Sequence, residues 1–389
     1  MKLVFFAHPT FLGSQSMMRF TSYLSIGMQA REHEVQIWSP RASFFKLPLP
    51  QFIKKWMGYI DQYILFKFWV FKKIKNCPSD TLFIFTDQAL GPWVPWIGDR
   101  PHVIHCHDFL AQRSALGQIK ENATKWAGRQ YQAYIRRGYQ RGRNFVSVSK
   151  KTQIDLHQFL LKSPSISEVV YNGLNQTFLP GDFNAARVVL ELKTGIDLTG
   201  GYVLHIGGNQ WYKNRVGVIE IYNAFRLENE LALPLLLIGQ QPSVSLLEIY
   251  LSSPYKNDIH FLDNIEDELL KVAYVGATLF VFPSLAEGFG WPIAEAMASG
   301  CLVITTEEDP MKEVAGNAGF LIPRKPYNKD EIRLWAREAG KVIDAVVKLS
   351  VEERSEEVKR GIENSKRFDA DITLNKIELI YQAIANDMH

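Results

Sequence analysis

The sequence has few cysteines, a small net charge and no long apolar run, and each of these absences excludes a class of protein. Its 389 residues contain three cysteines, Cys77, Cys106 and Cys301, which are widely spaced and odd in number. Such usage argues against a disulfide framework and fits a reducing compartment. The formal net charge is only +3, so charge gives no case for a nucleic-acid partner.

Signals for a membrane span or for export are also missing. No stretch reaches the ~18 uncharged apolar residues that a membrane span needs. The N-terminus runs directly into the apolar segment Leu3–Ala7, without the basic region and cleavage site of a signal peptide. We therefore expect a cytoplasmic protein, and peripheral attachment to the inner face of the cell membrane stays open.

The chain does have enough apolar material for about two domains, since 47% of its residues are hydrophobic. Short apolar runs alternate with helical segments such as 120–141, 216–225 and 266–275. The runs that we expect to form strands are 3–7, 34–38, 81–86, 102–107, 144–148, 168–171, 202–206, 235–238, 258–262, 278–282, 301–305 and 319–322. This alternation predicts βαβ units and parallel sheets covered by helices on both faces.

Two series of such units predict two Rossmann-like domains that face one another. The region between them, 172–200, is rich in Asn, Gly, Pro and Asp. We expect an N-terminal domain over 1–175 and a second domain over 176–369. The last helix, within 370–389, should pack back on the first domain.

The segment Phe282–Gly300 carries the most specific signal. The preceding run, Thr278–Phe282, predicts a buried strand that enters a glycine-containing loop, and Pro292 then opens a helix. Glu287 lies in that loop and Glu295 just past the first helical turn. Unpaired N–H groups and the helix dipole make such an end an anion site. Two carboxylates beside an anion site indicate a ligand with both hydroxyls and phosphates, a nucleotide sugar.

These residues resemble the E-x7-E signature of retaining GT-B glycosyltransferases, and of glycosyltransferase family 4 (glycosyl transferases group 1) in particular. The resemblance implies an α/β protein of the GT-B class, with two facing Rossmann-like domains, parallel sheets and an interdomain cleft. It also implies that Glu287 binds hydroxyls of the donor sugar and that Glu295 binds the ribose. In the alternative interpretation, Glu287 is a surface loop residue and Glu295 merely complements the helix dipole.

A second segment, Val203–Arg215, runs from a strand through a glycine loop into a helix that carries Lys213 near its start. It is similar to the family's G-x-x-x-x-[RK]-K-N segment, in which the lysine grips the diphosphate. The family often has a second basic residue here. This chain has Gly208 near the strand end and Tyr212 before the lysine, so Arg215 is the nearest candidate. Alternatively, Lys213 is a solvated loop lysine.

The donor-binding set implied by the resemblance extends beyond these two segments. It includes the backbone amides of the loop before the helix and an apolar turn that borders the base. Its members are Gly13, Gly208, Asn209, Lys213, Arg215, Leu262, Glu287, Gly288, Phe289, Gly290 and Glu295.

The motif His105-Cys106-His107-Asp108 closes another predicted strand. It resembles the family's strand-end histidine, which lies near the donor sugar, so His107 joins Glu287 as a catalytic residue. Side chains alternate along a strand, so His105 and His107 should share one face and Cys106 the other, which argues against a metal cluster. The alternative for His107 is a hydrogen-bonded structural histidine. Asp108 either orients His107 or binds the acceptor.

The loop His8–Ser16 follows the first strand. Members of the family carry a glycine loop there, under the donor phosphates and beside the acceptor pocket. Here Gly13 stands alone, so its role depends mostly on its position. Ser14 and Asp108 are the candidates on the acceptor side. We expect no metal and no cofactor, and we interpret the Asp-x-Asp at 369–371 as a helix cap.

Residues 51–75 interleave lysines with aromatic residues and contain one acid, Asp61. This composition is typical of an interfacial helix on an anionic membrane. It also fits a covering helix whose lysines are simply solvated, and the sequence leaves both open.

The function that the resemblance implies is metal-independent, retaining transfer of a sugar from a nucleotide-diphosphate sugar to a hydroxyl of a glycan or lipid-linked acceptor. Such reactions serve surface polysaccharide or glycolipid synthesis. Two alternatives remain: a GT-B nucleotide-sugar epimerase, and a non-catalytic membrane-associated scaffold. The intact glutamates argue against the scaffold.

Overall fold

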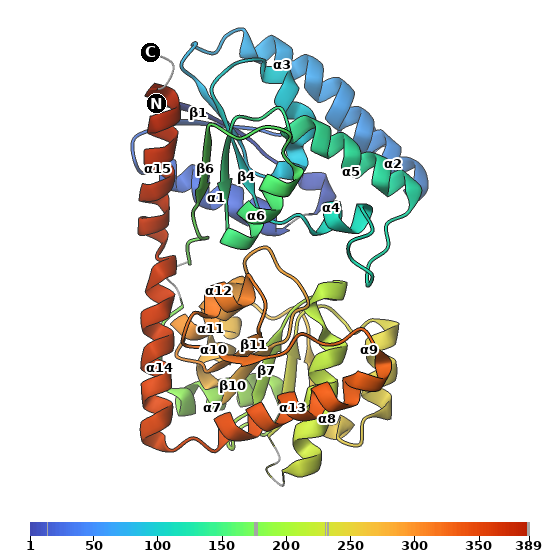
Figure 1. Ribbon diagram of the computed structural model, residues 1–389, viewed down its shortest axis with the longest axis vertical. Helices are drawn as coiled ribbons and strands as arrows, with labels where there is room; N and C mark the ends of the chain where they lie inside the picture. The colour runs from blue at the N-terminus through green and yellow to red at the C-terminus, as the bar shows by residue number, and fades with distance from the viewer. Residues whose placement is uncertain (14, 175–177, 230, 232, 387–389) are drawn as a thin grey trace. The chain divides into compact units, whose positions relative to one another are not determined.

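A computed structural model (Figure 1) describes residues 1–13, 15–174, 178–229, 231 and 233–386. The chain divides into two compact units. Unit 1 comprises Met1–Tyr171 with Asp371–His389, and unit 2 comprises Asn172–Ala370. Each unit is built on a six-stranded sheet in which every described pair of neighbouring strands is parallel. The predicted α/β class with parallel sheets is confirmed, and all twelve expected strands form, with ends that differ from the prediction by at most two residues.

The sheet of unit 1 has the strand order β2-β1-β3-β4-β5-β6. Its strands are β1 (Lys2–Phe6), β2 (Glu34–Trp38), β3 (Leu82–Phe85), β4 (His102–Cys106), β5 (Asn144–Ser147) and β6 (Ile166–Val169). Its α-helices are α1 (Gln15–Gln29), α2 (Gln51–Ile60), α3 (Phe66–Ile74), α4 (Leu110–Ala115), α5 (Trp126–Tyr139), α6 (Lys150–Phe159) and α15 (Ala370–Asn386). A π-helical turn, η3 (Asp61–Leu65), joins α2 to α3, and a 3-10 segment, η4 (Gln88–Ile97), follows β3.

Alternate residues of these strands supply two separate cores in unit 1, because successive side chains point to opposite faces of a sheet. Val4 and Phe6 belong to a cluster with residues of α3, η4, α5 and α6. Leu3 and Phe5 belong to a second cluster, with residues of α1 and α15. The C-terminal helix therefore completes a face of the N-terminal sheet.

The sheet of unit 2 has the order β12-β11-β10-β7-β8-β9. Its strands are β7 (Val203–Ile206), β8 (Leu235–Ile238), β9 (Ile259–Leu262), β10 (Leu279–Phe282), β11 (Val303–Thr306) and β12 (Phe320–Ile322). Its α-helices are α7 (Phe183–Thr194), α8 (Arg215–Glu228), α9 (Val244–Ser252), α10 (Asp267–Gly276), α11 (Trp291–Ala298), α12 (Met311–Ala315), α13 (Lys329–Val347) and α14 (Val351–Ser365). The 3-10 turn η5 (Trp211–Lys213) precedes α8.

One predicted helical segment is shorter than expected. Helical periodicity suggested a helix over 120–141, but α5 spans only Trp126–Tyr139. The preceding residues turn instead, and Asn122 donates from Nδ2 to Ser114 Oγ at 3.2 Å. Within the described parts of the chain, no helix is both long enough and apolar enough to cross a membrane.

Strand order identifies the place in each unit where a ligand is expected. It reverses between β1 and β3 in unit 1, and between β7 and β10 in unit 2. Open parallel sheets bind ligands beyond the carboxyl ends of the strands at such a switch point. The residues that follow β1, β3, β7 and β10 are therefore the first to inspect.

Candidate functional site

An ion pair spans the switch point of unit 2. Lys213, which follows β7, places Nζ 2.7 Å from Oε1 of Glu287, which follows β10. Ser284 Oγ donates to the same carboxylate oxygen at 2.9 Å. The two charged side chains are only 16% and 9% exposed. The alternatives of a solvated lysine and a surface glutamate therefore do not describe these residues.

The backbone next to Lys213 explains why an asparagine follows it. Asn214 has a left-handed conformation with φ 52° and caps α8, because its Oδ1 accepts from Gly217 N at 3.2 Å. Its Nδ2 donates to the carbonyl of Pro283 at 2.9 Å. A Cβ on Gly217 would lie 2.4 Å from the Asn214 side chain, so only glycine fits there. The Lys-Asn pair thus ties the loop after β7 to the end of β10.

Arg215 is a buried cation with neutral partners. It is 5% exposed, and its Nη1 donates to Asn209 Oδ1 and to the carbonyl of Gln240, both at 2.7 Å. Its Nε and Nη2 are buried and find no hydrogen-bond partner among the residues that the structure describes. Burial lowers its pKa to about 10. Its guanidinium therefore contributes a positive electrostatic field beneath the loop of Gly208 and Asn209. It does not present exposed N–H groups that a ligand could contact directly.

Glu295 lies in α11, which begins at Trp291, one residue before the expected Pro292. Its side chain is buried, at 6% exposure, and accepts a hydrogen bond from Tyr274 at 3.1 Å. A residue that only complemented the helix dipole would not need a buried partner. The carboxylate is held in one place instead.

The remaining expected donor residues of unit 2 lie at the same edge of the sheet. Gly290, with φ 100°, is the N-cap of α11, and Phe289 is buried with its ring 5.3 Å from that of Phe368. Gly288 precedes them in the same loop, and Leu262 ends β9, where its carbonyl accepts from Gly239. The fold therefore gathers the predicted residues of unit 2 at the carboxyl ends of β7, β9 and β10.

In unit 1, His107 directly follows β4 and is buried. Its Nε2 lies 2.9 Å from the Thr86 carbonyl. A carbonyl can only accept, so Nε2 carries the proton and Nδ1 keeps a lone pair. Burial lowers the His107 pKa, which favours the neutral ring. His107 therefore offers one acceptor nitrogen in a fixed orientation.

Sequence analysis did not identify the pair at the switch point of unit 1. His8, after β1, donates from Nε2 to Asp87 Oδ2 at 2.8 Å, and Asp87 follows β3. Asp87 Oδ1 also accepts from Ala89 N at 2.8 Å. Burial alone would raise the Asp87 pKa, but the His8 bond and nearby positive charge lower it overall. Asp87, like His107, directly follows the carboxyl end of a strand or lies one residue beyond it, and this position was the signal that could have identified it.

The other expected residues of unit 1 have simpler surroundings. His105 points into the core, where Tyr381 lies 2.7 Å from Nε2 and burial lowers the histidine pKa to about 3. His105 and His107 both contact Phe20, so the predicted shared face is confirmed. Asp108 Oδ1 accepts from Leu110 N at 2.9 Å, and Gly13 has φ 70° after a 3-10 turn. Ser14 lies outside the described residues.

No group of three or more His, Cys, Asp or Glu side chains that could hold a metal ion occurs in the part of the chain that the structure describes. His107 and Cys106 point to opposite faces of the sheet, as expected from strand alternation.

Residues 51–75 form α2, η3 and α3. We call the outward residues of this segment the aromatic–lysine face: Phe52, Lys55, Trp56, Phe68, Trp69, Phe71, Lys72, Lys73 and Lys75, all exposed. Asp61, the single acid, is 1% exposed and accepts hydrogen bonds from the amides of Ser43, Phe44 and Phe45 at 2.9–3.0 Å. Its negative charge is thereby removed from a surface that otherwise carries lysines.

Comparison with known families gives two matches. The model described as Glycosyltransferase Family 4 matches residues 17–178, and the model described as Glycosyl transferases group 1 matches residues 201–336. Among curated proteins, the O-antigen chain mannosyltransferase B of Escherichia coli is 34% identical over 123 residues. That match covers 31% of this chain and 32% of the relative, so it spans about a third of either length.

Solved structures share the fold over nearly the whole chain. The sucrose-phosphate synthase of Thermosynechococcus elongatus matches with a TM-score of 0.74 and 14% identity, covering 98% of this chain and 99% of that one. Anabaena HepE, in complex with UDP and glucose, matches with a TM-score of 0.71 and 16% identity, covering 98% and 100%. These likenesses establish the fold.

Proposed function

The chain belongs to glycosyltransferase family 4 and the glycosyl transferases group 1, and from that membership we propose that it transfers a sugar with retention of configuration. The donor is a nucleoside-diphosphate sugar, and the acceptor is a hydroxyl of a glycan or of a lipid-linked molecule. The observation that carries the proposal is the contact between Lys213 and Glu287 at the switch point of unit 2. This contact places a cation that can bind phosphate next to a carboxylate that can accept hydrogen bonds from hydroxyls.

We assign the donor to unit 2. Glu295 binds the ribose, and the Leu262 turn borders the base. Lys213 and the amides at Phe289 and Gly290 bind the diphosphate, and the field of the buried Arg215 supports them. A lysine serves phosphate as a point charge. Arg215 thus supplies the second positive charge that the glycine at 208 does not.

When the donor binds, Lys213 and Glu287 exchange each other for groups of the donor. Lys213 turns from Glu287 to the diphosphate, and Glu287 then accepts hydrogen bonds from sugar hydroxyls while Ser284 still holds it. When the bond between the anomeric carbon and the diphosphate oxygen breaks, negative charge grows on the diphosphate. Fixed cations and amides at that position stabilise the transition state electrostatically.

In the proposed retaining step the acceptor hydroxyl attacks the anomeric carbon from the face of the leaving group. The departing phosphate oxygen takes the hydroxyl proton, so the protein supplies no nucleophile. His107, neutral and with Nδ1 free to accept, fixes a hydroxyl of the substrate. The cations and donors named here account for the leaving group without a metal ion.

We propose mannose as the transferred sugar and a surface polysaccharide as the destination, because one of the curated relatives is an O-antigen chain mannosyltransferase. The nucleoside-diphosphate form of the donor is supported by the bound UDP of a structural neighbour. The aromatic–lysine face of unit 1 would hold the enzyme on an anionic membrane, where a lipid-linked acceptor is presented.

The proposal is tested with the purified chain, a panel of uridine and guanosine diphosphate sugars, and lipid-linked or free mannosides as acceptors. We expect acceptor-dependent transfer of mannose, a product with the donor's anomeric configuration by proton NMR, and no effect of chelators. Turnover without any acceptor would indicate the epimerase alternative, and an inverted product would falsify the retaining mechanism.

A test of the donor site uses Lys213→Ala and calorimetry. The variant should weaken binding of the nucleoside diphosphate at least tenfold and leave binding of the bare nucleoside nearly unchanged, because charge-assisted bonds to phosphate are about twice as strong as neutral ones. Equal losses for both ligands would place Lys213 away from the diphosphate.

A further inference from the structure

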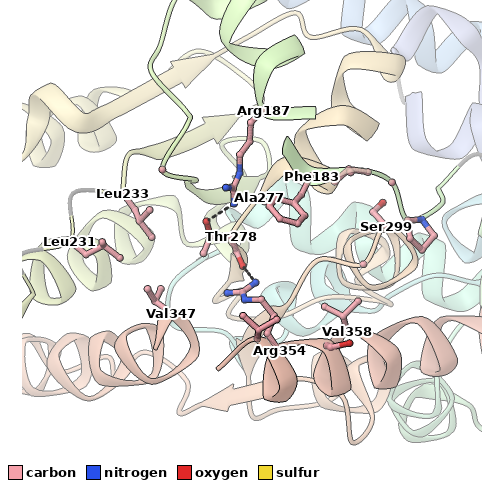
Figure 2. Close-up of a pocket in the computed structure, with 17 residues that line it drawn as sticks. Phe183, Arg187, Leu231, Leu233, Ala277, Thr278, Ser299, Val347, Arg354 and Val358 are labelled. Carbon is pink, nitrogen blue, oxygen red and sulfur yellow. Dashed lines mark hydrogen bonds between the residues drawn. The ribbon is translucent and has the colours of Figure 1, made fainter. Parts of the chain in front are cut away.

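We propose that unit 2 carries a second ligand site, for a small amphipathic anion, in the cavity that Arg187 and Arg354 share at the amino ends of the strands (Figure 2). The cavity has a volume of about 520 Å³, within the range of small-molecule pockets. This inference is independent of the proposed transferase reaction.

The cavity lies at the edge of the sheet opposite to the donor residues. It is lined by the segments that lead into four strands: Gly200 before β7, Leu231 and Leu233 before β8, Thr278 before β10, and Ser299 with Gly300 before β11. Lys213 and Glu287 follow the carboxyl ends of the same parallel strands. A four-residue strand at ~3.3 Å per residue separates the two edges by about 13 Å, so one ligand head cannot serve both.

Two arginines reach Thr278 from different helices, as Figure 2 shows. Arg187 of α7 donates from Nη2 to Thr278 Oγ1 at 3.4 Å and from Nε to the carbonyl of Gly276 at 2.9 Å. Arg354 of α14 donates from Nη1 to the Thr278 carbonyl at 2.9 Å. Both guanidinium groups are thus held at one wall of the cavity.

Neither arginine is neutralised by the protein. Among the residues that the structure describes, all their hydrogen-bond acceptors are carbonyls or a hydroxyl, and no carboxylate pairs with either group. An arginine has five N–H donors, and Arg354 uses one of them. The pair therefore has both charge and unused donors to offer.

The two positive charges also destabilise one another. Burial lowers the pKa of Arg354, and the charge of Arg187 lowers it further. Burial likewise lowers the pKa of Arg187. An anion bound between them would relieve both effects, and a planar guanidinium fork matches the oxygens of a phosphate or a carboxylate.

The rest of the lining is mainly apolar. Its hydrophobic members are Phe183, Leu231, Leu233, Val275, Ala277, Val347, Val351 and Val358. An inorganic ion alone would leave this wall uncovered. The chemistry that fits is an anionic head, phosphate or carboxylate, on an aliphatic body of a few carbons.

The experiment is calorimetry of the full chain with hexyl phosphate, hexanoate and hexanol as probes. We expect saturable binding of at least one of the two anions, and the one that binds tighter identifies the head group. Hexanol should bind at least tenfold more weakly. Equal affinity for hexanol, or no saturable binding of either anion, would overturn the proposal.

Variants locate the binding. Arg354→Gln should weaken the anion at least tenfold. The matched control is Arg360→Gln on the same helix, whose arginine is 56% exposed and paired with Glu357, and it should bind like wild type. Since Arg354 also holds Thr278, a second variant, Ser355→Trp, fills the cavity from an exposed lining position without removing a charge, and it should also abolish binding.

The donor site is the obvious competitor for a phosphate probe. Lys213→Ala should leave hexyl phosphate binding unchanged. If Lys213→Ala loses binding while Arg354→Gln and Ser355→Trp bind like wild type, the probe binds at the carboxyl edge of the sheet. That result would overturn the proposal of a second site.

Discussion

In each unit, a pair of side chains connects the two strands at the switch point, but the chemistry of the pair differs between the units. In unit 2, Lys213 and Glu287 connect the ends of β7 and β10. In unit 1, His8 and Asp87 connect the ends of β1 and β3. Both pairs bridge the two strands between which the strand order reverses.

The difference lies in the charge that each unit presents. In unit 2, Lys213 and the uncompensated Arg215 follow β7, and the neighbouring strand β10 leads into the N-terminus of α11; positive charge and a helix N-terminus both suit an anion. Unit 1 places a neutral His107 beside a carboxylate that is already held by His8. The same fold, used twice, therefore carries two cations at the switch point of one unit and a neutral histidine beside a hydrogen-bonded carboxylate at that of the other.

The largest effect should come from Glu287→Gln. Loss of a hydrogen bond to a charged group costs ~1.5–3 kcal/mol, which is roughly a 10- to 150-fold loss of transfer rate. Glu307→Gln, at a 54% exposed position after β11, is the matched control and should transfer at the wild-type rate. Transfer by Glu287→Gln near the wild-type rate would remove Glu287 from the reaction and erase the contrast between the units.

Asp87→Asn tests the other half of the comparison. It weakens the His8 contact in unit 1, so we expect about a tenfold lower transfer rate. Affinity for the nucleoside diphosphate, measured by calorimetry, should stay at the wild-type value. A loss of that affinity as large as in Lys213→Ala would contradict the assignment of nucleoside diphosphate binding to unit 2 alone.

In the sheet of each unit, burial lowers the pKa of a histidine to about 3: His105 in β4 of unit 1 and His205 in β7 of unit 2. The ordinary histidine pKa is 6.5, so the unfolded chain takes up protons first as the pH falls. The stability contributed is complete above pH 6.5 and is lost towards pH 3, by up to ~1.4 kcal/mol per pH unit for each histidine.

The check is denaturation between pH 7 and pH 4 of His105→Phe and His205→Phe. Each variant should show a shallower loss of stability in acid than wild type, whereas His157→Gln, at an exposed position, should keep the full slope. An unchanged slope in either variant would show that its unit does not hold the ring neutral.

The smallest effect per residue concerns the membrane. Each lysine near an anionic surface contributes ~1 kcal/mol, so Lys72→Gln and Lys73→Gln should each weaken binding to anionic vesicles about fivefold. The controls are Lys341→Gln on α13 of unit 2 and Lys348→Gln at the C-cap of the same helix, both exposed. If sedimentation shows no difference between the two sets, residues 51–75 are only a covering helix.

Local sequence determined a large part of this protein. All twelve strands follow from short apolar runs, because a strand of a parallel sheet that is covered on both faces is apolar at consecutive positions. Lys213 and Glu287 were identified because two strand–loop–helix segments of the sequence resemble motifs of the family. The helix α15 was expected as well, since its apolar face repeats locally.

Only the tertiary structure decided which partners these residues meet. His8 and Asp87 are 79 positions apart, and Lys213 and Glu287 are 74 apart. Their contacts arise from the strand order, which no local pattern encodes. For the same reason the sequence could show neither that Glu287 is shielded nor that Arg215 is buried among neutral acceptors.

The cavity of Arg187 and Arg354 is the clearest case of this limit. Its walls come from several loops and from the helices α7, α10, α13 and α14, spread over residues 180–358. In the sequence, each arginine is an ordinary polar position in an amphipathic helix. They become a pair because two helices pack against the amino ends of one sheet, and burial there removes the water that would otherwise solvate each charge.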